Sequence, residues 1–257
     1  MYDFLTGPML WASFGIFFFG LLYRIIWYVR GLNWQLDRVA YGEHKAMGFK
    51  GALRSVFFWL IPFGSVGWRA KPLFTITFYA FHFGLVLVPL FLEGHLIMLE
   101  EGIGISWPAM PMWLADTLTI AALIAAVFII LRRIALPEVR ILTTAYDYFL
   151  IAVAVAPLLT GFLAVHEIGD YKFWLLVHIF SAEVLLILIP FTKLNHVVGF
   201  FLSRAQLQPQ RDGTAAGANH SSRAPGLLGL LPDSGHTAKR GFHRSLQKRI
   251  RSAQGHL

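Results

Sequence analysis

The sequence predicts an all-α integral membrane protein, a bundle of five transmembrane helices. Its 257 residues are 56% hydrophobic and only 14% charged, whereas charged residues make up about 25% of a soluble domain. Five apolar segments approach the ~20 residues that a helix needs to cross a bilayer. Lysine and arginine collect in alternate connections between these segments, as they do in multi-pass membrane proteins.

The five predicted spans follow one another along the first four fifths of the chain. They cover residues 9–29, 73–98, 113–131, 147–165 and 173–195. Another apolar stretch, "SVFFWLIPFGSVGW" at 55–68, is too short to span and is interrupted by Pro62 and Gly64. We expect this stretch to be interfacial or re-entrant. Residues 1–203 are therefore predicted to form one membrane domain.

The distribution of positive charge predicts the orientation of the bundle. Of the 22 lysine and arginine residues, all but Lys172 fall on one set of alternate sides. Positive residues favour the cytoplasmic side, so the N-terminus is predicted in the periplasm and the C-terminus in the cytoplasm. Residues 204–257 supply most of the net charge of +8 and are predicted to be a basic, disordered tail. Because the charge is concentrated in this tail, it does not indicate nucleic-acid binding.

The candidate cofactor ligands are histidines. The chain contains no cysteine, which excludes disulfides, cysteine-ligated iron–sulfur clusters and thiolate metal sites within it. Polar residues inside membrane spans are costly and therefore indicate function. Five of the ten histidines lie in or at the ends of the predicted spans: His82, His95, His166, His178 and His196. Two imidazoles on neighbouring helices can bind a haem through both axial positions of its iron.

Depth in the membrane pairs four of these histidines. The second span runs outward, so His82 lies toward the cytoplasm and His95 lies near the outer surface. The fifth span runs inward, so His178 is the outer residue and His196 the inner one. On a straight helix the residues from His178 to His196 make five turns over ~27 Å, and both side chains face the same way. The pairs His82/His196 and His95/His178 thus predict one haem near each membrane face, with all four histidines as iron ligands.

The outer pair has an alternative composition. On a straight helix His95 points about 140° away from His82, although Pro89 and Gly94 lie between them and can bend the segment. His166, at the outer end of the fourth span, is the alternative partner of His178.

Three further residues are candidates for supporting roles. Gly84 is expected to leave room for a haem plane beside His82. Lys193, one turn before His196, could neutralise a haem propionate or extend to the membrane interface. Glu183, inside the fifth span, could accept a hydrogen bond from a neighbouring helix or serve a proton path.

Two motifs resemble a known family. "FHFG" in the second span and "H…IPFTKLNH" in the fifth resemble the membrane b-type cytochrome subunit of respiratory nitrate reductase. Over residues 1–204 the chain is still more similar to the cytochrome b subunits of the Hmc and Tmc transmembrane redox complexes of sulfate-reducing bacteria. The stretches that carry this similarity are "MYDFLTGPMLWAS", "FHFGLVLVPLFLEGH", "LRRIALPEVRILTTAYDY", "LLTGFLA" and "IPFTKLNH".

The resemblance implies a five-helix subunit with two b-type haems in a bacterial cytoplasmic membrane. Such a subunit passes electrons between periplasmic multihaem c-type cytochromes and a cytoplasmic iron–sulfur partner during sulfate respiration, and it is not catalytic alone. In the nitrate reductase subunit the second ligand of this helix lies ten residues after the first, where this chain has Leu92. The resemblance implies that His95 replaces it.

Two other functions remain alternatives from the sequence. One is a menaquinol-oxidising or menaquinone-reducing cytochrome b that uses the same haems. The other belongs to a different class, a haem-free membrane protein in which the histidines relay protons or only pack the bundle.

Overall fold

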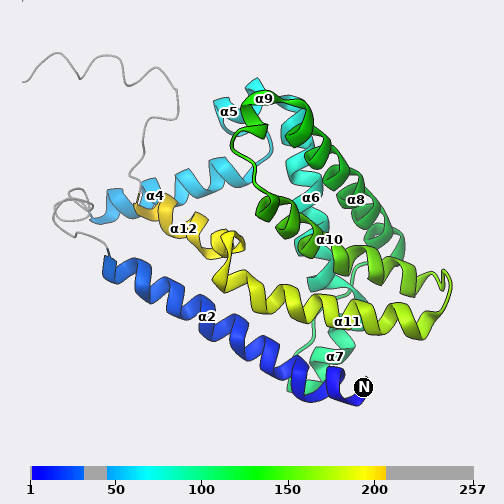
Figure 1. Ribbon diagram of the computed structural model, residues 1–257. Coiled ribbons are helices and arrows are strands. Elements are labelled where there is room, and N and C mark those ends of the chain that lie inside the picture. Colours follow the sequence, from blue (N-terminus) through cyan, green and yellow to red (C-terminus); the bar gives the residue numbers. More distant parts are fainter. Residues whose placement is uncertain (1, 32–44, 207–257) are drawn as a thin grey trace, which may run out of the picture. The chain divides into compact units, whose positions relative to one another are not determined.

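The computed structural model describes residues 2–31 and 45–206, and every regular element in these two ranges is a helix (Figure 1). The longer elements are α2 (Leu10–Gly31), α4 (Lys45–Leu60), α6 (Pro72–Phe91), α7 (Glu93–Ile103), α8 (Met112–Ala135), α10 (Ala145–Val165), α11 (Tyr171–Leu188) and α12 (His196–Gln206). The short ones are α1 (Tyr2–Phe4), η1 (Leu5–Met9), α5 (Val66–Ala70), α9 (Pro137–Arg140), η2 (Ile189–Phe191) and η3 (Lys193–Asn195). The predicted basic tail lies outside the described residues from residue 207 onward.

Five helical segments are long and apolar enough to cross a membrane. They are Tyr2–Gly31, Pro72–Phe91, Met112–Ala135, Ala145–Val165 and Tyr171–Phe191. Many large apolar side chains on them are exposed, among them Phe19, Trp27 and Ile124. A soluble protein rarely leaves so much apolar surface bare, whereas lipid covers it in a membrane. The predicted fold class is therefore confirmed, an all-helical protein with five helices capable of spanning.

The first span begins at Tyr2 rather than at residue 9. Pro8 has no N–H to donate to the carbonyl four residues before it. The chain accommodates Pro8 in the wide turn η1, where the N–H of Leu10 reaches the carbonyl of Leu5. The helix therefore continues through Pro8 and begins seven residues before the predicted start of the span.

The second predicted span, 73–98, is divided into two helices. α6 ends at Phe91, Leu92 is extended, and α7 then begins at Glu93. The break frees carbonyl groups at the end of α6, and later residues satisfy them. Trp107 Nε1 donates to the Leu90 carbonyl at 2.9 Å, and the Met110 N–H donates to the Phe91 carbonyl at 2.8 Å.

The fifth predicted span, 173–195, is not one straight helix either. α11 ends at Leu188, and Pro190 lies in the short helix η2. Thr192 is extended and its hydroxyl accepts from the Leu194 N–H, which starts η3. A separate helix, α12, begins at His196. The prediction that His178 and His196 share one face of a continuous helix is therefore wrong, because proline ends the helix between them.

Small residues allow the spans to pack closely, as is common between membrane helices. Gly84 of α6 lies against α8, where a side chain would meet Ala122 and the Leu118 carbonyl. The expectation that Gly84 leaves room for a haem is thus wrong, since α8 fills that space. Gly20 of α2 similarly lies against Pro190 after α11.

The apolar stretch 55–68 is broken where its sequence predicted. α4 ends at Leu60, and α5 begins at Val66 with the Ser65 hydroxyl accepting from the Trp68 N–H. A side chain at Gly64 would collide with the Phe58 carbonyl, so this tight turn requires glycine. α4 packs on α12, and the Arg204 guanidinium lies 4.1 Å from the Trp59 ring centre.

Candidate functional site

The structure brings four histidines together in two facing pairs. His82 of α6 faces His196 at the start of α12, with ring centroids 6.2 Å apart and ring planes at 75°. His95 of α7 faces His178 of α11, with ring centroids 5.9 Å apart and ring planes at 8°. These are the two pairs that depth in the membrane predicted.

The separation of the rings matches two ligands of one metal ion. When two imidazoles bind a metal from opposite sides, each nitrogen lies about 2 Å from the metal, and the ring centres lie about 6 Å apart. Packed aromatic rings have the same range of separations. The spacing of both histidine pairs is therefore compatible with two ligands of one metal ion and with direct ring packing.

Hydrogen bonds fix which nitrogen of each ring is available. The Nδ1 atom of each paired histidine lies 2.8–3.0 Å from a backbone carbonyl oxygen. The accepting residues are Phe78, Pro89, Pro157 and Lys193. Because a carbonyl can only accept, each Nδ1 carries the hydrogen, and Nε2 keeps the lone pair that binds a metal. Histidines that ligate metals use their other nitrogen in this way.

A glycine on the neighbouring helix positions His178. A side chain at Gly161 of α10 would lie 2.8 Å from His178 Nδ1. The absence of that side chain lets the imidazole reach the Pro157 carbonyl at 2.9 Å. Gly161 therefore leaves space on α10 for the His178 ring, and the Pro157 carbonyl accepts its hydrogen bond.

The helix break at Leu92 positions His95. A continuous helix would turn this residue away from His82 by about 140°, whereas the extended Leu92 re-aims the chain so that His95 meets His178. His95 Nδ1 donates to the Pro89 carbonyl at 3.0 Å, one of those that the break leaves free. Burial lowers the pKa of His95, which lies in α7 beyond the span Pro72–Phe91, and the nearby His178 ring lowers it further. The neutral imidazole, the form that binds metals, is thereby favoured.

His166 has a different partner. It follows the last residue of α10, and its Nε2 lies 2.9 Å from Asp116 Oδ1 of α8. Its ring also packs on Phe162 one turn earlier, with centroids 4.4 Å apart. The structure thus brings His95 to His178, whereas Nε2 of His166 bonds a carboxylate.

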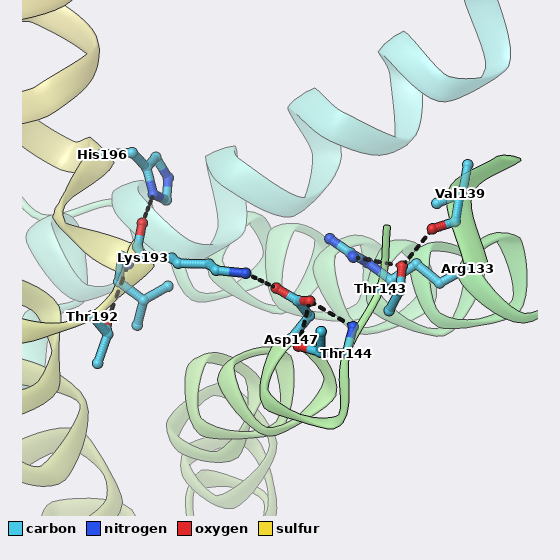
Figure 2. Close-up of polar contacts among 9 residues, drawn as sticks. Arg133, Val139, Thr143, Thr144, Asp147, Thr192, Lys193 and His196 are labelled. Atoms are coloured by element: carbon cyan, nitrogen blue, oxygen red, sulfur yellow. Dashed lines mark hydrogen bonds and ion pairs between the residues drawn. The ribbon is translucent and has the colours of Figure 1, made fainter. Parts of the chain in front are cut away.

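Lys193 lies in an ion pair beside the His82/His196 pair. Its Nζ is 2.7 Å from Asp147 Oδ1, and its backbone carbonyl accepts from His196 Nδ1 (Figure 2). Asp147 also accepts from the backbone N–H and the hydroxyl of Thr144, which caps α10. An ammonium group has three N–H donors, so the ion pair leaves donors for the predicted propionate contact.

Asp147 is the residue that sequence reasoning missed. Its position in the sequence did not suggest a role in the site, although the spacing of Thr144 and Asp147 is typical of a helix-capping box. The capping pattern could have indicated Asp147 as fixed in place. Its ion pair with Lys193, 46 residues later, depends on tertiary structure.

The fold and the site define the class of this protein: an all-helical protein with five helices capable of spanning a membrane and two facing histidine pairs. A protein of Nitratidesulfovibrio vulgaris (strain Hildenborough) described only as "Protein" is 61% identical to it over 207 residues. The similarity covers 80% of this chain and 92% of the relative, and the chain belongs to the same family as that protein. No known family profile and no solved structure matches the sequence.

Proposed function

We propose that this protein is a di-haem b-type cytochrome that carries electrons across the bacterial cytoplasmic membrane. The observation that carries this proposal is that the imidazole rings face each other in two pairs. The ring centroids of His82 and His196 lie 6.2 Å apart, and those of His95 and His178 lie 5.9 Å apart. When bound, haem supplies reversible one-electron chemistry at its iron.

The residues present fit a haem at each pair. All four Nδ1 atoms donate to backbone carbonyls, so four Nε2 lone pairs are available as axial ligands. The ligands come from different helices, α6 with α12 and α7 with α11, so each site closes only when the bundle assembles. The protein's contribution is to orient the rings and to surround them with apolar side chains, which tune the potential of the iron.

The two pairs lie at different levels of the bundle, which supports transfer from one membrane face to the other. The helix between His82 and Phe91 rises about 14 Å, at ~1.5 Å per residue, and α7 begins only after it. Haems held at the two histidine pairs would therefore let electrons pass from one level of the bundle to the other.

The orientation and partners belong to the same proposal. The basic connections favour a periplasmic N-terminus and a cytoplasmic C-terminus. We infer from the family resemblance that the partners are a multihaem c-type cytochrome outside and an iron–sulfur protein inside. The similar N. vulgaris protein comes from a sulfate-reducing bacterium, which supports a role in sulfate respiration.

Replacement of single histidines tests this function. The purified wild-type protein should show b-type bands in its reduced-minus-oxidised spectrum and contain two haems per chain. His82→Ala and His196→Ala should each lose one haem, and His95→Ala and His178→Ala should each lose the other. His166→Ala is the matched control and should retain both, because Nε2 of His166 bonds Asp116.

Two results would contradict the proposal. A wild-type protein without b-type bands would point to the haem-free alternative. Loss of one haem in His166→Ala, with both retained in His95→Ala, would show that the site at His178 has a different second ligand.

A further inference from the structure

A carboxyl group lies buried in the fifth span without a partner. The Glu183 side chain in α11 is 1% exposed, and neither of its oxygens has a hydrogen bond within the described part of the chain. Burying an ionised carboxylate without a partner is among the most costly arrangements in a protein. Within a membrane span such a residue indicates function.

Within the described residues, no charged side chain forms an ion pair with Glu183. The elements packed against α11 are α10, α2, η1 and η2, and α7 meets α11 where His95 faces His178. Charged or titratable side chains are absent from residues 10–22 of α2, from residues 149–165 of α10 and from η1. Those that occur on these elements, on α7 and on α11 itself are Tyr23, Arg24, Tyr28, Arg30, Glu93, His95, Glu100, Glu101, Tyr146, Asp147, Tyr148, Tyr171, Lys172 and His178. Of these, Arg24 donates to the Pro190 carbonyl, and Asp147 binds Lys193.

The nearest of these groups along the chain is an imidazole of a histidine pair. Glu183 follows His178 by five residues, a rise of about 7.5 Å along the helix, and points about 140° away from it. The carboxyl therefore lies about one and a half turns along α11 from His178 and on a different face of the helix from the ligand. Electrostatic interactions over such distances are strong inside a protein because the dielectric constant is low.

We propose that Glu183 is a redox-linked proton-binding site. It binds one proton from solvent when an electron arrives at the iron held by His95 and His178, and it releases that proton when the electron leaves. The ferric site would carry one positive charge more than the ferrous site, so the oxidised state favours the carboxylate of Glu183 more than the reduced state does. One electron and one proton are added, the only new bond is O–H on Glu183, and charge is conserved near the site. This inference rests on the proposed haem function.

Redox titration of the purified full-length protein at several pH values tests the inference. In the wild type, the potential of one haem should fall as pH rises, by up to about 59 mV per pH unit, the tenfold change in proton concentration converted for a one-electron couple. In Glu183→Gln, which keeps the shape and removes the proton, the potential of that haem should not change with pH. Glu183→Asp should restore a pH-dependent potential.

Glu100→Gln is the matched control. Glu100 follows His95 by five residues, as Glu183 follows His178, but it is exposed in α7. This variant should keep the wild-type dependence on pH. An infrared difference spectrum between oxidised and reduced protein should also show a carboxylic-acid band that appears on reduction and is missing in Glu183→Gln.

The possible results separate this inference from the function on which it rests. A pH-independent wild-type potential, or an unchanged slope in Glu183→Gln, would overturn the role of Glu183 while two b-type haems would still support the cytochrome. Absence of b-type bands from the wild type would overturn both.

Discussion

Backbone carbonyl groups orient the four paired histidine rings. Each ring donates its Nδ1 hydrogen to a carbonyl of its own segment or of the neighbouring helix. Three of the four acceptors lie within six residues of the histidine, whereas the Pro157 carbonyl that accepts from His178 belongs to α10. The position of His178 therefore depends on how closely α10 and α11 approach.

Gly161→Ala tests this dependence. The added methyl group would lie 2.8 Å from His178 Nδ1, so the ring must move and lose its bond to the Pro157 carbonyl. We expect haem content to fall from two per chain toward one, with the His82/His196 haem retained. Gly15→Ala, another glycine within a span but with no atom near the added methyl group, should keep both. Retention of both haems in Gly161→Ala would show that haem binding does not require the space that Gly161 leaves beside His178.

The sequence was sufficient to pair His82 with His196, but it left His95 and His166 as alternative partners of His178. Alternation of the spans gives the depth of each histidine, and depth matched both pairs that the structure brings together, although His166 lies at the same outer depth as His95. The direction in which the His95 side chain points depends on the extended backbone of Leu92. The ion pair of Lys193 joins it to Asp147, which lies 46 residues earlier in the sequence. Residue spacing on an ideal helix contains neither piece of information.

Breaks in the helices shape both sites. α6 stops at Leu92 and α11 stops before Pro190, so each histidine pair includes a residue that follows a break. Proline and glycine in the sequence marked these regions. The exact residue of the first break depends on Trp107 and Met110, whose N–H groups satisfy the carbonyls at the end of α6. Because those donors lie 17 to 19 residues away in sequence, local pattern could not identify the break.

Close packing of α6 on α8 supports the helix that carries His82. A methyl group at Gly84 would lie 2.5 Å from both the Ala122 Cβ and the Leu118 carbonyl oxygen, and a backbone atom cannot yield easily. We expect Gly84→Ala to lower the free energy of unfolding by about 1–3 kcal/mol, the usual effect of overpacking. Thermal or denaturant unfolding in detergent measures this, with Gly15→Ala as the control. Equal stability of the two variants would show that α6 and α8 can separate without loss.

The five-helix bundle has an asymmetric distribution of charge, and this determines its expected orientation. Lysine and arginine follow the first, third and fifth spans, whereas the connections after the second and fourth contain only Lys172. Fold class and span number were predictable because length and hydropathy determine them.

Single cysteines can report the orientation, because the chain has none of its own. Glu101→Cys in α7 and Glu138→Cys in α9 replace exposed residues on opposite sides of the bundle's predicted topology. A membrane-impermeant maleimide added to intact spheroplasts should label Glu101→Cys at once and Glu138→Cys only after lysis. The reverse pattern would place the N-terminus in the cytoplasm. The His95/His178 pair would then lie on the cytoplasmic side and the His82/His196 pair on the periplasmic side.

The electron paramagnetic resonance spectrum of the oxidised protein tests the proposal of two bis-histidine haems most directly. The ring planes are nearly parallel at His95/His178, at 8°, and steeply inclined at His82/His196, at 75°. Ferric iron between inclined imidazoles gives a more anisotropic low-spin signal than iron between parallel ones. We predict two low-spin signals, the more anisotropic one lost in His196→Ala and the other lost in His178→Ala. A wild-type spectrum with no low-spin signal, or two signals that both survive these substitutions, would contradict the account.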